Sequence, residues 1–186
     1  WCCRNKKYPD YIVEESVSIR AVKRVYAEKS GDMAALTPKD IFDIAEGIRP
    51  GNRQAAIAAF EELGEIAGDA IASAVTLVDG LIVMGGGLSG ASKYILPALM
   101  RELSGTTGMM NGNRFARLQM KPFNLEDPDE LQEFLKGQVK QVQIPGTNRW
   151  VDYDPYKRIG VAISKQGASR SIALGAYQYA LAKLNL

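Results

Sequence analysis

A glycine-rich loop is the stretch of this sequence whose residue types could hold a ligand. Residues 80–90 read GLIVMGGGLSG, so the short apolar run 81–84 ends in three consecutive glycines. Four apolar residues are too few for a buried helix and favour a central parallel strand covered on both faces. Glycines without Cβ atoms let another molecule approach the backbone closely. Because a helical pattern follows at 91–103, the loop lies where α/β sheets bind nucleotides and phosphates.

Two other interpretations of this loop must be weighed. A glycine-rich turn between a strand and a helix can be tight for structural reasons alone, and Ser89 can be a helix cap. Gly85, Gly87 and Gly90 also fit the spacing G-x-G-x-x-G of dinucleotide-binding folds. That fold needs an acidic residue about 20 residues further on, at the end of the next strand. The next strand candidate, 118–120, runs into Lys121, so we exclude the dinucleotide fold.

Composition bounds the function further. The chain has 186 residues, 46% of them hydrophobic, and a net charge of +2, which indicate one globular domain with no strong field for nucleic acid or a membrane surface. Histidine is absent, so imidazole cannot act as a general base or a metal ligand. The two cysteines, Cys2 and Cys3, are adjacent and too few for a thiolate zinc site. No apolar run is long enough to span a membrane, and we expect a cytoplasmic protein.

Periodicity and capping residues predict a helix-rich α/β chain. Asn52 is expected to cap the longest helix, whose apolar C-terminal half should be buried, with Gly64 and Gly68 allowing close packing. The last helix should bury a side that includes Ile172 and Tyr177. Residues 104–113 are predicted to be a polar loop. The expected helices are 12–30, 38–46, 52–78, 91–103, 127–135 and 168–184, and the expected strands are 81–84, 117–122, 139–144, 150–153 and 159–164, with 139–144 and 150–153 forming a hairpin.

Three segments resemble the C-terminal part of the ROK family of sugar kinases and sugar-responsive repressors. They are EESVSIRA at 14–21, the alanine-rich helix leading to LIVMGGGLSG at 52–90, and GASRSIALGAYQYAL at 167–181. The resemblance implies one lobe of an actin-like ATPase (ribonuclease H-like) fold, with a small mixed sheet. The function implied is that of a glucokinase-like enzyme, which transfers phosphate from ATP to a hydroxyl of a hexose such as glucose.

The resemblance also assigns roles to residues. The loop Gly85, Gly86, Gly87, Leu88 and Ser89, together with Gly167 and Ala168, would bind the nucleotide, and Glu14 would contact the sugar. From the residues alone, an acidic residue that stabilises a helix N-terminus is the favoured interpretation of Glu14, because the neighbouring Glu15 blurs the match to the family.

The chain also departs from the family. The zinc site of the family uses the pattern Cys-x-Cys-Gly-x-x-Gly-Cys, which Cys2-Cys3-Arg4-Asn5 lacks, so we expect no zinc. The family's phosphate loop and catalytic Asp precede the segments matched here. We therefore expect residues 1–186 to be a C-terminal fragment of a two-lobed kinase, with 105–158 as an insertion and with magnesium bound through the other lobe.

Two functional expectations follow. The fragment alone should be inactive, and it should associate with the N-terminal lobe or with itself. The alternative function is a sugar-sensing ROK-type transcriptional regulator that binds sugar without catalysis.

Overall fold

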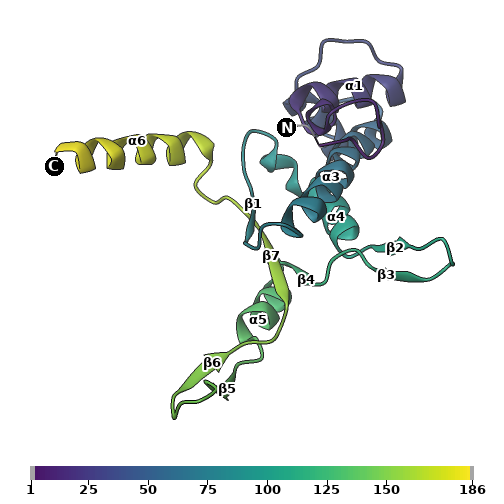
Figure 1. The fold of residues 1–186 in the computed structure, drawn as a ribbon. Helices are drawn as coiled ribbons and strands as arrows, with labels where there is room; N and C mark the ends of the chain where they lie inside the picture. The colour runs from purple at the N-terminus through teal and green to yellow at the C-terminus, as the bar shows by residue number, and fades with distance from the viewer. Residues whose placement is uncertain (1–2, 185–186) are drawn as a thin grey trace.

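The structure is a computed structural model that describes residues 3–184 and consists of a helical body, a small parallel sheet and several projecting segments (Figure 1). The elements are η1 (Val13–Glu15), α1 (Ile19–Ser30), α2 (Pro38–Glu46), α3 (Arg53–Val75), β1 (Ile82–Met84), η2 (Ser89–Ala91), α4 (Ser92–Leu103), β2 (Thr106–Gly108), β3 (Arg114–Ala116), β4 (Lys121–Asn124), α5 (Pro128–Lys136), β5 (Lys140–Gln143), β6 (Trp150–Tyr153), β7 (Arg158–Ile163) and α6 (Ala168–Leu184). The chain is therefore mixed α/β and rich in helix, as predicted.

Capping residues set the start of the helices in the body. The Asn52 side chain accepts a hydrogen bond from Ala55 N and begins α3, as its position predicted. Thr37 and Asp40 form a capping box on α2. The helix expected at 12–30 starts later, because Ser18 caps α1 and the residues before it form only the short turn η1.

The two glycines of α3 allow α4 to pack against it closely, as predicted. A Cβ atom on Gly64 would lie 2.2 Å from the carbonyl oxygen of Ile95, and one on Gly68 would lie 2.9 Å from that of Leu99. Any side chain at these positions would push the helices apart. This contact fixes α4, and therefore the loop that leads into it, against the helical body.

The main sheet has the strand order β1-β7-β4, and all pairs are parallel. The prediction that 81–84 is a central strand covered on both faces is wrong for this chain. β1 lies at an edge, and the side chain of Val83 is 62% exposed. The reason is that within residues 3–184 only β7 pairs with β1, while α3 and α4 pack against one side of the strand.

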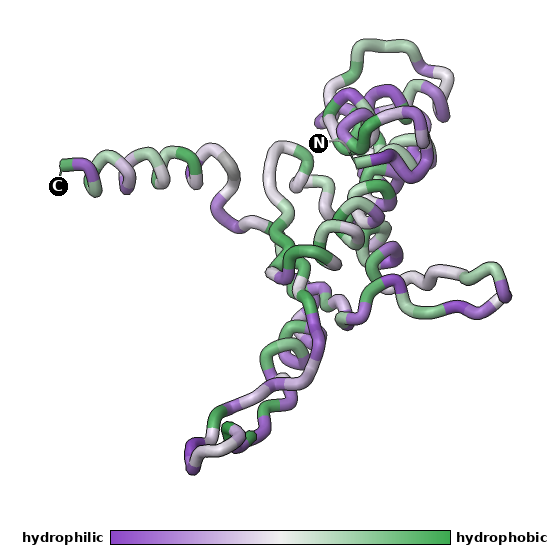
Figure 2. The backbone as a smooth tube through the Cα atoms, viewed as in Figure 1, coloured by the Kyte–Doolittle hydropathy of each residue, from purple (hydrophilic) through white to green (hydrophobic). Residues whose placement is uncertain are grey.

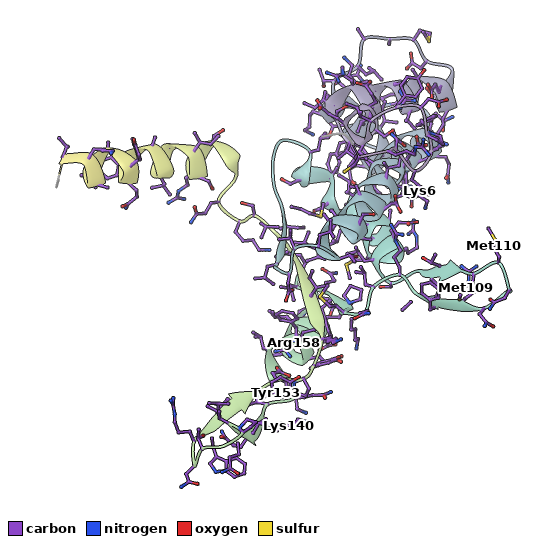
Figure 3. The ribbon with its side chains drawn as sticks, viewed as in Figure 1. Lys6, Met109, Met110, Lys140, Tyr153 and Arg158 are labelled. Atoms are coloured by element: carbon purple, nitrogen blue, oxygen red, sulfur yellow. The ribbon has the colours of Figure 1, made fainter. Side chains whose placement is uncertain are left out.

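The region 105–158 forms two hairpins, the helix α5 and the strand β4 of the main sheet. β5 and β6 pair around residues 144–149, as predicted, and Asp127 caps α5. The strand predicted at 117–122 is misplaced, because β3 ends at Ala116 and β4 begins at Lys121. The loop predicted at 104–113 instead contributes β2, which pairs with β3, and Figure 3 shows Met109 and Met110 towards the far end of that hairpin.

One prediction of burial is wrong, and another holds only in part, because Ile66, Ala72 and Val75 in the C-terminal half of α3 are buried as predicted. The end of the long helical segment is exposed, with Leu77 at 86%, and α6 projects from the rest of the chain with Ile172 at 71% (Figure 1). Figure 2 shows hydrophobic residues along both the projecting helix and the sheet. The apolar residues of α6 and the outward side of β1 at Val83 stay exposed because no described element packs on them.

Candidate functional site

Two loops lie side by side at one edge of the main sheet. β1 and β7 are parallel, and Met84 is in register with Ile163, so both strands end at the same level. Ser164 N donates a hydrogen bond of 2.8 Å to Met84 O. A Cβ atom on Gly85 would lie 3.7 Å from the Cβ of Ser164. The sheet therefore brings the starts of the two loops together at Gly85 and Ser164, although about 80 residues separate them in the chain.

The glycine loop presents an open backbone. Gly86 has a φ of +97°, a conformation that side chains other than glycine rarely adopt, and a Cβ there would meet no atom within 4 Å. Gly87 likewise has open space around it, and Gly167 in the second loop has a φ of +73° with nothing within 4 Å. These positions leave room for a ligand to approach the main chain.

Ser89 closes the glycine loop. Its hydroxyl donates a hydrogen bond of 2.7 Å to Gly86 O, and its own N–H donates to the same oxygen at 3.1 Å. The helix-cap alternative for Ser89 is wrong, because α4 begins at Ser92 and its N-cap, Ala91, makes no side-chain cap. Ser89 instead holds the turn, and its hydroxyl oxygen can still accept a hydrogen bond.

Glu126 holds the second loop and was not singled out from the sequence. One carboxylate oxygen accepts a hydrogen bond of 2.9 Å from Ile163 N, and the other pairs with Lys165. The hydrogen bond from Lys165, followed by that from Ile163 N, lowers the pKa of Glu126. The only sign of this role in the sequence is that Glu126 comes just after β4, since functional residues of parallel sheets lie at the carboxyl ends of the strands.

Glu14 lies in a trough that continues to the glycine loop. It is exposed on η1 and lines a cavity of about 380 Å³. A neighbouring cavity of about 450 Å³ is lined by Gly85, Gly87, Leu88 and Ser89. The two cavities share three apolar lining residues, Val17, Ala67 and Ile71. The structure thus places Glu14 and the glycine loop along one apolar surface. The helix-terminus alternative for Glu14 does not hold for α1, which begins five residues later, but Glu14 does lie in the first turn of the short 3-10 helix η1.

The final helix does not cover this trough. Gly167 precedes α6, and Ala168 is its first residue, but the helix runs away from the glycine loop (Figure 1). The side chain of Ala168 lies outside the described part of the structure. Only the start of α6 is therefore placed near the two loops.

Metal-binding residues do not gather in the part of the chain that the structure describes. Residues 3–184 contain no group of three or more Cys, Asp or Glu side chains placed to hold an ion. Cys3 is an exposed free thiol, and Cys2 lies outside the described residues. The expected absence of zinc therefore remains a prediction.

Among the residues described, none of the helices has the length and apolar character needed to cross a bilayer.

Comparison with known proteins shows a close likeness to a solved structure. No family model matches the chain, and no curated protein matches it. The crystal structure of a glucokinase from Parabacteroides distasonis is similar to it, with 67% sequence identity and a TM-score of 0.84. The match covers 97% of this chain and 49% of the glucokinase, so the chain spans about half of that protein's length. The predicted resemblance is confirmed: nearly all of this chain is similar to part of a glucokinase.

Proposed function

We propose that this chain is the nucleotide-binding lobe of an ATP-dependent hexose kinase of the glucokinase type, with the actin-like ATPase fold of the ROK family. The observation that carries the proposal is the 67% identity to a glucokinase over 97% of the chain. The adjacent glycine loops add support, because an open backbone at the carboxyl ends of parallel strands suits a nucleotide.

The nucleotide is proposed to lie across the two loops. Gly85, Gly86 and Gly87 offer backbone N–H groups at close approach, and Leu88 offers apolar contact. Ser89 offers a hydroxyl oxygen that can accept a hydrogen bond, while its own hydrogen is used in closing the turn. Gly167 and Ala168 contribute the second wall. Glu126 keeps that wall in place through Ile163 N and Lys165.

The sugar is proposed to contact Glu14. A carboxylate accepts hydrogen bonds from two neighbouring hydroxyls, and this one is exposed at the trough. In the transfer step, a hydroxyl oxygen of the sugar attacks the γ-phosphorus, the bond to the β–γ bridging oxygen breaks, and ADP leaves. The base that takes the hydroxyl proton and the ligands of magnesium are proposed to come from the other half of the kinase.

A chimera tests the proposal directly. In the Parabacteroides distasonis glucokinase, the region matched by this chain is replaced by residues 1–186. ATP-dependent phosphorylation is then measured with glucose and a panel of other hexoses and amino sugars. We expect turnover with glucose, with the unaltered glucokinase as the reference.

Two outcomes oppose the proposal. A folded chimera that phosphorylates none of the sugars would refute the kinase function. If such a chimera still bound sugar, the sugar-sensing regulator would become the better explanation.

A further inference from the structure

Asn5 is a buried amide at the centre of the segment before η1. Only 1% of its surface is exposed. Its side-chain oxygen accepts hydrogen bonds from Lys7 N at 3.0 Å and from Tyr8 N at 3.1 Å. Its side-chain nitrogen donates to Ser16 Oγ at 2.7 Å and to Ile12 O at 3.4 Å. Both ends of the amide are therefore paired, as a buried amide requires.

These hydrogen bonds lie on either side of Glu14. Ile12 and Ser16 flank the turn η1, in which Glu14 is the middle residue. Backbone bonds join the same two segments, from Asn5 N to Tyr11 O at 3.0 Å and from Val13 N to Cys3 O at 3.1 Å. A three-residue turn has little stability of its own, so its orientation depends on such partners.

The same segment is also anchored to the helical body. Lys7 pairs with the buried carboxylate of Glu62 on α3, and Tyr8 OH lies 3.4 Å from that residue. Lys6 pairs with Glu65 at 2.9 Å and with Glu102 at 2.6 Å, and Figure 3 shows it beside α3 and α4. The amide of Asn5 thus joins a segment fixed on α3 to the turn that carries Glu14.

We propose that Asn5 is a positioning residue for sugar binding, because it holds the turn that presents the carboxylate of Glu14 to the sugar hydroxyls. The inference rests on the proposed function, since it takes Glu14 as the sugar contact. Glu14 is the middle residue of η1, so the place from which its side chain starts depends on how this turn is held.

The first test is kinetic and uses the chimera described above. Asn5→Ala should raise KM for glucose about tenfold and leave kcat within about twofold, because a displaced carboxylate weakens sugar binding equally in the ground and transition states. Ser16→Ala removes one of the same hydrogen bonds and should act in the same direction with a smaller effect. The matched control is Asn148→Ala, an exposed asparagine in the β5–β6 turn.

A double variant separates positioning from general weakening. If Asn5 and Ser16 act through one hydrogen bond, Asn5→Ala combined with Ser16→Ala should raise KM no further than Asn5→Ala alone. If the increases in KM caused by the two single substitutions multiplied in the double variant, the inference would be overturned. Equal relative losses of kcat and of sugar affinity in Asn5→Ala would also overturn it.

The second test measures the turn itself in the 186-residue chain. Hydrogen exchange at the amides of Val13 and Ser16 should become faster in Asn5→Ala and stay unchanged in Asn148→Ala. Unchanged exchange in both variants would overturn the inference. If Asn5→Ala fails to fold, Ser16→Ala supplies the same two readouts.

The failures of the two proposals are distinguishable. Glu14→Gln tests the sugar contact. An unchanged KM for glucose in that variant would refute the assignment of Glu14 to the sugar, and the inference about Asn5 would fail with it. A raised KM in Glu14→Gln with an unchanged KM in Asn5→Ala would overturn only the inference about Asn5.

Discussion

Replacing Gly64 by Ala should destabilise the chain, although alanine is the better helix former. The new Cβ would lie 2.2 Å from Ile95 O and 3.0 Å from the Cβ of Ala98. Ordinary contacts between such atoms are about 3.5 Å, so α3 and α4 would have to separate by roughly 1 Å. The obstacle is a backbone carbonyl within a helix, which cannot rotate away as a side chain can.

The magnitude follows from two opposing effects. Overpacking of this kind costs about 3 kcal/mol at the upper end of its usual range. The higher helix propensity of alanine offsets about 1 kcal/mol. The net loss in the free energy of unfolding should be about 2 kcal/mol, which corresponds to a Tm lower by about 4–8 °C for a chain of this size.

Urea unfolding followed by circular dichroism measures this loss, with Gly175→Ala as the matched control. Gly175 is also inside a helix, but a Cβ there would meet no atom within 4 Å. The control should be neutral or slightly stabilising. If Gly64→Ala were as stable as the parent chain, the close packing of α3 on α4 would be refuted.

Four further outcomes are expected. Gly86→Val should weaken ATP binding in the chimera, measured by calorimetry, because it fills the open loop at a φ of +97°; unchanged binding would refute the nucleotide assignment. Glu126→Gln should lower the free energy of unfolding at pH 7 but less at pH 3. Folding lowers the pKa of Glu126, so its ionised carboxylate stabilises the chain at pH values above its unfolded pKa of about 4.3. This stabilisation is lost as the pH falls through the pKa of the folded state. Unfolding midpoints that differ equally at both pH values would contradict this. Metal analysis should find no stoichiometric zinc, since residues 3–184 offer no cluster of ligands. The 186 residues alone should sediment as an oligomer, because β1 is an uncovered edge. They should show no kinase activity, because the catalytic base is proposed to come from the other half of the kinase; an active monomer would contradict both expectations.

Much of the local structure could be predicted from the sequence, because its causes are local. Asn52 and Asp127 cap the helices that follow them, and Gly47 ends α2 with a φ of +76°. The hairpin of β5 and β6 follows from two alternating segments around a Pro-Gly turn. The glycine loop was found because three glycines after an apolar run are an unusual local pattern.

Tertiary structure decided which of these segments meet. The pairing of β1 with β7 brings Gly85 next to Ser164, and it depends on contacts between distant parts of the chain that no local pattern encodes. The role of Glu126 arises in the same way, from the parallel pairing of β4 with β7. Burial was the least predictable property, because an apolar helix side such as that of α6 is buried only if another element covers it. Sequence periodicity determined that α6 has apolar residues to bury, whereas the packing partners available to the chain determined that they remain exposed.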